Sequence, residues 1–133
     1  IINNLNIIKS EIESKKKKVN IIAVSKTFPI NMIIPLINNG HVHYGENKVQ
    51  EAVDKWSSIK TDFKHIKLHL IGKLQTNKVK FVLPLFDFIH SLDSKKLAEK
   101  IFLEQKKKIL NQRYLFKLIL EERSKKMELI RKI

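Results

Sequence analysis

A lysine at the end of an apolar stretch is the residue of this sequence best suited to covalent chemistry. Residues 19–25 are apolar and rich in β-branched side chains, and Lys26 follows them directly, before the turn-forming Phe28 and Pro29. In parallel α/β proteins, sites form where strands end. Partial burial there lowers the pKa of a lysine amine and makes it a nucleophile for Schiff-base formation. The alternative, which the pattern alone favours, is a lysine that extends from the strand end into water.

Other polar side chains follow or lie within predicted strands. Asn47 comes after a Gly-Glu pair and could bind a ligand, but Asn is also a good helix N-cap residue. His69 and His90 could be ligands or acid–base groups, although histidines in strands are more often hydrogen-bonded residues of the core. His41 and His43 alternate on one strand, but no carboxylate or cysteine at suitable spacing completes a metal site. We therefore assign no metal, and no residue is assigned a catalytic role.

Short apolar runs alternate with helical periodicity along the first hundred residues, and these elements must position the polar groups. Strands are predicted at 19–25, 41–44, 66–71 and 85–90, and helices at 1–18, about 30–39, about 47–56, 79–82 and 95–106. This alternation indicates βαβ units and a parallel sheet covered by helices. Four βα units are too few for a closed (β/α)8 barrel of about 250 residues. The sequence thus predicts an open α/β sheet, or half of a barrel, preceded by a helix.

The composition suits one folded domain and weighs against several classes. The chain has 133 residues, 43% apolar, with a net charge of +14. A basic chain raises the possibility of a nucleic-acid-binding module. However, the lysine runs, Lys15–Lys18 and Lys106–Lys108, are not interleaved with aromatic residues that could stack on bases. Abundant Ile, Lys and Asn are typical of A- and T-rich codon usage, which raises the charge without selection for a polyanion.

The compartment is also constrained by composition. The sequence has no Cys, so it can form neither a disulfide framework nor a thiolate metal site. Polar residues interrupt every apolar run before the roughly 20 residues that a membrane span needs. The first ten residues do not match a secretory signal. We expect a cytoplasmic protein with no membrane partner.

Four motifs, in order, resemble the pyridoxal 5′-phosphate homeostasis proteins, the YggS/PROSC family. The motifs are Ala-Val-Ser-Lys-Thr at 23–27, Gly-Glu-Asn-x-Val-Gln-Glu-Ala at 45–52, His-x-Ile-Gly-x-Leu-Gln-x-Asn-Lys at 69–78, and His-Ser-Leu-Asp-Ser at 90–94. Each motif alone is weak, but four in register over about residues 5–103 are specific. One small departure is Phe28, where many members have a second lysine.

The resemblance implies a fold, a cofactor and a function. It implies the N-terminal half of a (β/α)8 barrel like the N-terminal domain of alanine racemase, with pyridoxal 5′-phosphate held as a Schiff base on Lys26. We take Lys26, Asn47 and His69 as cofactor-binding residues. Family members bind the cofactor, act in its intracellular homeostasis, and are expected to be monomers. The alternative is a racemase or decarboxylase on the same barrel, which would need an acid–base partner opposite Lys26.

The sequence after about residue 105 departs from the family. The motifs of the second barrel half, including phosphate-binding loops and an arginine facing the pyridine nitrogen, have no match. If 108–120 and 126–133 are written in A/T-rich codons and read one base over, the triplets encode a strand resembling Phe-Ile-Gln-Val-Asn and then a Gly-Ile motif. We therefore interpret 1–105 as a partial barrel domain and 106–133 as an out-of-frame or divergent helical tail.

This interpretation has a structural consequence. A tail without a native fifth strand would leave the predicted fourth strand, 85–90, at the edge of the sheet with unpaired backbone groups. Self-association of the chain would then be possible. The alternative for the tail is a genuine helix, since its apolar residues around Leu118 have helical spacing.

Overall fold

The computed structural model describes residues 1–108 and 116–118, and everything below refers to these residues. Helices and strands alternate along the chain after an initial helix. The elements are α1 (Ile2–Ser14), β1 (Ala23–Val24), α2 (Ile30–Asn38), β2 (His43–Glu46), α3 (Val49–Asp62), β3 (Lys67–Leu70), a 3-10 turn (Thr76–Lys78), α4 (Val79–Val82), β4 (Phe88–Leu92), α5 (Lys95–Lys108) and β5 (Phe116–Leu118).

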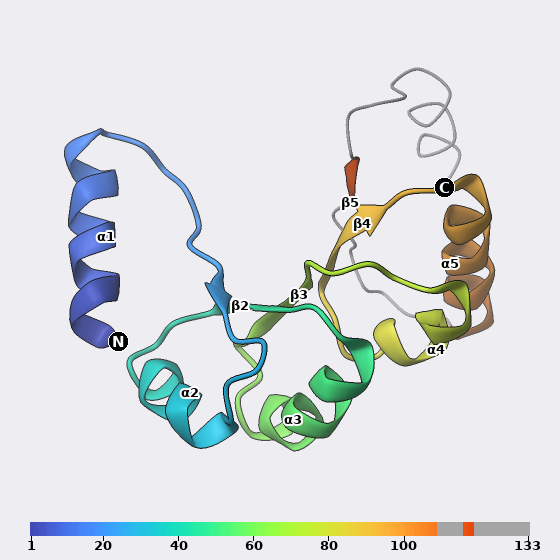
Figure 1. The fold of residues 1–133 in the computed structure, drawn as a ribbon, viewed down its shortest axis with the longest axis horizontal. Helices are drawn as coiled ribbons and strands as arrows, with labels where there is room; N and C mark the ends of the chain where they lie inside the picture. Colours follow the sequence, from blue (N-terminus) through green and yellow to red (C-terminus); the bar gives the residue numbers. More distant parts are fainter. Residues whose placement is uncertain (109–115, 119–133) are drawn as a thin grey trace.

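The strands form one parallel sheet in chain order, β1-β2-β3-β4-β5. Val24 pairs with Gly45, Gly45 with His69, and His69 with Phe88, so these four residues lie at one level across the sheet. Figure 1 shows the strands along the inner side of an arc and helices α2–α5 along its outer side. The predicted α/β class, with a parallel sheet built from strand–helix repeats, is confirmed.

The core lies between the sheet and the helices. Side chains alternate between the two faces of a strand, and Tyr44, Leu68, Leu70 and Ile89 are the strand residues that pack towards the helices, each fully buried. Trp56 of α3 packs on Tyr44, with ring centroids 5.0 Å apart. We call the opposite face of the sheet, on the inner side of the arc, the inner face.

Element boundaries shift from those predicted, mainly at strands. β2 begins at His43 rather than residue 41, and β4 covers Phe88–Leu92 rather than 85–90. β1 is reduced to Ala23–Val24. Leu85 and Phe86, just before β4, are buried without being part of the strand, so hydrophobicity alone does not locate its first residue. The 79–82 helix is confirmed, and Gly40 has the left-handed φ of +81° that ends α2.

The described part of the tail corrects one expectation. β4 is not an open edge, because Phe116–Leu118 pairs with it as a parallel strand, β5, and this segment is not helical. The edge of a parallel sheet presents N–H and C=O groups that an additional extended segment can satisfy. Lys106–Lys108 belong to the last turn of α5. The other residues of the predicted tail, 109–115 and 119–133, lie outside the described residues.

Gly72 is required where two loops meet after β2 and β3. A Cβ atom added at Gly72 would lie 2.7 Å from Asn47 Cα, and would clash with the Asn47 carbonyl oxygen as well. Both atoms belong to the backbone, so the clash cannot be relieved by a side-chain rotation. The close contact of the two loops therefore depends on the missing side chain of Gly72.

We expect Gly72→Ala to destabilise the fold by displacing the Asn47 loop, with a clear fall in the midpoint of urea unfolding. Gly40→Ala is the matched control, since a Cβ at Gly40 meets no atom within 4 Å and costs only the strain of its positive φ. A Gly72→Ala protein as stable as Gly40→Ala would contradict the packing described for these loops.

Candidate functional site

Lys26 lies in a turn at the carboxyl end of β1. The strand ends at Val24, and the turn of Lys26 and Thr27 follows, with Thr27 at a φ of +65°. Lys26 is exposed, so the partial burial expected from the sequence is wrong. The reason is that β1 is shorter than predicted and the chain leaves the sheet before Lys26. The amine is accessible to a molecule approaching the carboxyl-end edge of the sheet.

A buried glutamate holds the residue before Lys26. Glu46, at the end of β2, has no exposed surface, and its Oε1 accepts hydrogen bonds from Ser25 Oγ at 2.7 Å, Trp56 Nε1 at 2.9 Å and Lys55 Nζ at 3.0 Å. Lys55 Nζ also donates to the Ser25 carbonyl oxygen at 2.9 Å. A buried carboxylate needs such donors because desolvation of an unpaired charge is costly. Glu46 thus fixes the side chain of Ser25, and Lys55, paired with the same carboxylate, fixes the backbone carbonyl of Ser25.

A second glutamate holds the residue after Lys26. The Thr27 backbone N–H donates to Glu51 Oε1 at 2.8 Å, and Lys55 Nζ lies 3.7 Å from the same oxygen. Lys26 is therefore flanked by two anchored residues while its own side chain stays exposed. Sequence reasoning missed Glu46, Glu51 and Lys55 as supports. The available signal was the acid directly after Tyr44 and Gly45, followed nine residues later by Lys55 within the predicted helix.

Asn47 follows β2 at the same edge of the sheet. Helix α3 begins at Val49 with Lys48 in the N-cap position, so the alternative role of Asn47 as the N-cap is wrong. Asn47 is half-buried, and its backbone lies against Gly72 after β3. Because Val24 pairs with Gly45, Lys26 and Asn47 each lie two residues beyond the same level of the sheet. The structure thus brings two of the three predicted site residues to neighbouring loops.

His69 lies one strand further on and is joined to two other histidines. Its Nε2 is 2.9 Å from His43 Nδ1, and its Nδ1 is 2.8 Å from His90 Nε2. The Phe88 ring stacks on His69 with centroids 4.3 Å apart. All four side chains lie on the inner face. The sequence placed His43 and His90 in strands but did not predict that the three imidazoles would be connected.

Burial changes the acidity of these histidines. Desolvation, followed by the neighbouring His90 and His43, lowers the pKa of His69 to about 4, while Asp87 acts in the opposite direction. Desolvation also lowers the pKa of His43, with Asp87 raising it and Lys67 lowering it. The neutral imidazole is therefore the favoured form of His69 at neutral pH.

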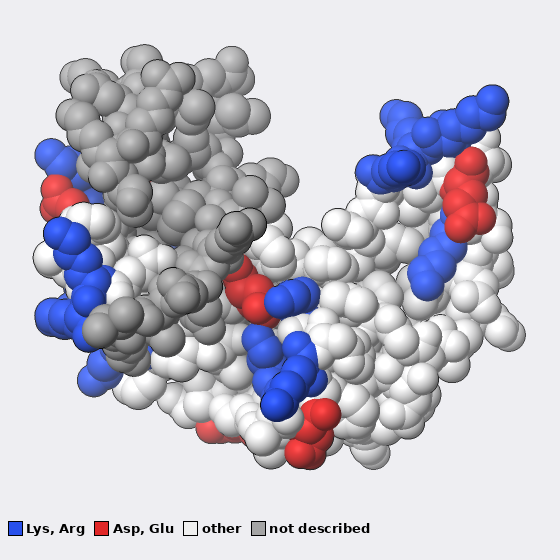
Figure 2. All heavy atoms as spheres, turned by 180° about the vertical axis from the view of Figure 1, so that it is seen from behind, with Lys and Arg blue, Asp and Glu red and all other residues white. Residues whose placement is uncertain are grey.

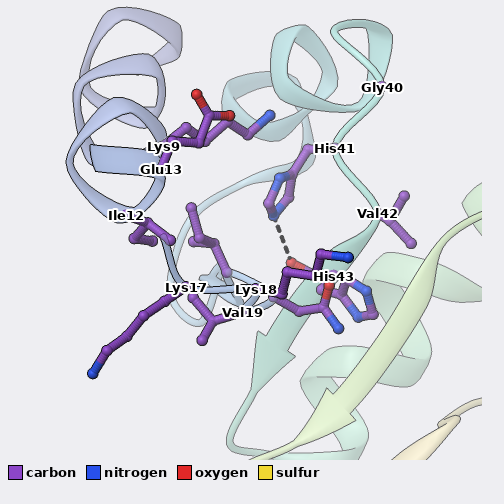
Figure 3. Close-up of a pocket in the computed structure, with 12 residues that line it drawn as sticks. Lys9, Ile12, Glu13, Lys17, Lys18, Val19, Gly40, His41, Val42 and His43 are labelled. Atoms are coloured by element: carbon purple, nitrogen blue, oxygen red, sulfur yellow. Dashed lines mark hydrogen bonds between the residues drawn. The ribbon is translucent and has the colours of Figure 1, made fainter. Parts of the chain in front are cut away.

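His41 does not join this group. Its Nε2 donates to the His43 carbonyl oxygen at 2.9 Å, and its ring meets Tyr44 edge-on. His41 lines a cavity of about 680 Å³ between α1 and residues 17–21 and 40–43, where Lys9, Glu13 and Lys18 also lie (Figure 3). In the described part of the chain, no cluster of three or more His, Cys, Asp or Glu side chains is arranged to hold a metal ion.

Basic side chains are dispersed over the surface. Figure 2 shows lysine side chains in separate groups on one face, and Lys15–Lys18 follow the end of α1. None of the helices within residues 1–108 combines the length and the apolar character needed to cross a membrane.

The low pKa of His69 makes the free energy of unfolding depend on pH. The folded chain keeps His69 neutral down to about pH 4, whereas an unfolded histidine takes up a proton near its ordinary pKa of 6.5. Between these values the unfolded state binds more protons, so the free energy of unfolding should decrease as pH falls from about 6.5 to about 4. His69→Gln removes this contribution and should flatten the decrease, as measured by urea unfolding at a series of pH values.

His65→Gln is the matched control, because His65 is exposed and lies outside the inner face. It should keep the wild-type dependence on pH. If His69→Gln and wild type lost stability in parallel over this range, His69 would not be the group responsible.

Together these residues define a class of protein: a parallel α/β sheet whose carboxyl-end loops present one exposed, firmly positioned lysine beside an inner face lined by histidine and phenylalanine.

Curated relatives are similar to this chain in sequence. Over 105 residues the chain is 37% identical to the pyridoxal phosphate homeostasis protein of Haemophilus influenzae, covering 74% of this chain and 44% of that protein. Over 102 residues it is 41% identical to the pyridoxal phosphate homeostasis protein of Buchnera aphidicola from Schizaphis graminum, covering 71% and 44%.

Solved structures agree with this relationship. PipY of Synechococcus elongatus, solved with pyridoxal phosphate bound, is 37% identical with a TM-score of 0.65, covering 74% of this chain and 46% of PipY. A structure described as an unknown protein from Bifidobacterium adolescentis is 31% identical with a TM-score of 0.73, covering 85% of this chain and 51% of that protein. No family model matches the chain.

The resemblance seen in the sequence is therefore confirmed: the chain is a relative of the pyridoxal phosphate homeostasis proteins over about three quarters of its own length. It spans less than half the length of the curated relatives described above.

Proposed function

We propose that this chain binds pyridoxal 5′-phosphate as a Schiff base on Lys26 and serves intracellular homeostasis of that cofactor. In this proposal Asn47 and His69 lie beside the cofactor, and no turnover of a further substrate is required. Residues 1–105 would be the part of a (β/α)8-type barrel that carries the lysine, and Phe116–Leu118 adds a strand to the same sheet. The partner is a small molecule rather than a nucleic acid or a membrane.

The observation that carries the proposal is the anchoring of Lys26. Ser25 and Thr27 are fixed by Glu46 and Glu51, while the amine between them remains exposed at the carboxyl-end edge of the sheet. Such an arrangement restricts the backbone and leaves the nucleophile free to react, which is how a protein positions a cofactor. The relatives named for pyridoxal phosphate homeostasis, and PipY with this cofactor bound, support the identity of the ligand.

The described residues fit one end of the cofactor. Lys26 supplies the amine for the aldehyde, and the inner face beside it, with Val24 and Phe88 at one level, offers an apolar and aromatic surface for a flat ring. No arginine occurs among the described residues to pair with the phosphate or to face the ring nitrogen. The barrel interpretation draws on the arc of strands in Figure 1 and on relatives of about twice the matched length. We therefore expect attachment to be selective for Lys26 but readily reversible.

Chemical trapping tests this proposal. Protein mixed with substoichiometric pyridoxal phosphate and reduced with borohydride should carry the cofactor on Lys26, because this exposed amine lies between two anchored residues. Peptide mapping by mass spectrometry measures the share of label at each lysine. Lys26→Ala should remove most of the label.

Lys73→Ala is the matched control, since Lys73 is another exposed lysine, in the loop after β3. Its label should equal that of the wild type. A label distributed over the exposed lysines in proportion to their accessibility would overturn the assignment of Lys26 and with it the proposed function.

A further inference from the structure

The turn that carries Lys26 contains a backbone conformation that its sequence does not favour. The Phe28 N–H donates to the Ser25 carbonyl oxygen at 3.2 Å, which closes a four-residue turn around Lys26 and Thr27. Thr27 has a positive φ of +65°, whereas Lys26 does not have a positive φ. A positive φ at the third residue alone is the pattern of a type II turn, in which glycine is the usual residue at that position.

Threonine is poorly suited to this position. Its branched Cβ makes the left-handed region an outlier, and such a conformation persists only where surrounding contacts hold it. Among the described residues other than glycine, Lys16 is the other one with a positive φ, and it follows the end of α1. Left-handed residues commonly end helices, but Thr27 does not end one. A contact outside the turn must therefore keep Thr27 in its conformation.

The chain is fixed on both sides of Lys26 and Thr27, which we call the central pair. On one side, the Ser25 N–H donates to the backbone of β2 at 3.0 Å. On the other side, Pro29 has a φ of −68° and precedes α2, and its ring restricts Phe28 to extended conformations. Backbone rotation is thus left mainly to the central pair.

One side chain holds the central pair. Glu51 Oε1 accepts the Thr27 N–H at 2.8 Å, and within the described part of the chain this is the only hydrogen bond of the central pair. Glu51 lies in the first turn of α3 with its side chain 31% exposed, and Lys55 Nζ is 3.7 Å from the same oxygen. A hydrogen bond from a backbone N–H to a carboxylate is stronger than one between neutral groups. Glu51 is therefore the contact that can hold the left-handed Thr27.

We propose that Glu51 is a positioning residue for the Lys26 amine. By holding the Thr27 N–H, it keeps the turn in its left-handed form and sets the direction in which the lysine leaves the sheet edge. Without Glu51, Thr27 relaxes to a negative φ, the central pair rotates, and Lys26 becomes one exposed lysine among others. The hydrogen bonds of Glu46 reach Ser25 but not the central pair, so its role is different. The inference rests on the function proposed above, because it concerns the lysine that attaches the cofactor.

Proton NMR of the full chain measures the turn without any cofactor. A positive φ brings the amide proton of a residue close to its own Hα, so Thr27 should give a strong cross-peak between these two protons. Glu51→Ala should weaken this cross-peak. Gln50→Ala is the matched control and should leave it unchanged, since Gln50 is exposed on the same helix and its side chain is hydrogen-bonded to Asp54. An equally strong cross-peak in Glu51→Ala would overturn the proposal.

Selective labelling measures the consequence for the lysine. After reduction with borohydride in substoichiometric pyridoxal phosphate, we expect Glu51→Ala to lower the ratio of label on Lys26 to label on Lys73 by about fivefold, the population shift that a small backbone strain produces. Thr27→Gly in the Glu51→Ala protein should restore most of this ratio, because glycine adopts a positive φ without strain. A change at Thr27 would not correct a weakened first turn of α3, so the rescue separates positioning from helix stability.

Glu51→Gln separates the hydrogen bond from the charge. The amide oxygen of glutamine can still accept the Thr27 N–H, so this variant should keep a ratio nearer to the wild type than Glu51→Ala does. An unchanged ratio in a folded Glu51→Ala protein, or a double variant without recovery, would overturn the proposal. If the wild type shows no preference for Lys26, the proposed function fails, and the Thr27 cross-peak alone decides whether Glu51 holds the turn.

Discussion

The buried carboxylate of Glu46 is the interaction on which the candidate site depends. It is the only fully buried charged side chain among the described residues, and one of its oxygens takes donors from Ser25 of the β1 turn and from Lys55 and Trp56 of α3. It therefore ties two strands and a helix to one point beside Lys26. Removing one member of a buried ionic group costs roughly 3–5 kcal/mol. We infer that the position of the lysine and the stability of the sheet edge are linked through this residue.

The alternation of side chains lets one short strand serve two purposes. In β2, Tyr44 and Glu46 point to the helices and hold the core and the Lys26 turn, while His43 and Gly45 face the inner side and leave it open. A side chain at Gly45 would press on Ile22 and Ile71, each 3.1 Å from an added Cβ. The residues that support the Lys26 turn and the residues that face the inner side are thus separated by the two-residue period of the strand.

Much of this architecture could be predicted from the sequence, because apolar periodicity reports directly on burial. The parallel α/β class, the 79–82 helix and the left-handed Gly40 followed from local patterns. The exposure of Lys26 could not be predicted, since the end of a strand depends on which residues pair. The strand β5 could not be predicted either, because Phe116–Leu118 finds its partner β4 only in the assembled sheet. The hydrogen bonds to Glu46 and those among His43, His69 and His90 could not be predicted either, because they join residues from different strands and helices that only the assembled sheet brings together.

The most direct test of this account measures whether Glu46 positions Lys26. Glu46→Gln keeps the size of the side chain but removes the negative charge that pairs with Lys55 Nζ, 3.0 Å from Oε1. Glu104→Gln, which alters an ion pair on α5, is the matched control. After reduction with borohydride in the presence of pyridoxal phosphate, the account predicts that folded Glu46→Gln protein, verified by circular dichroism, loses the preference of the label for Lys26 while Glu104→Gln retains it. An unchanged share of label on Lys26 in Glu46→Gln would contradict the account.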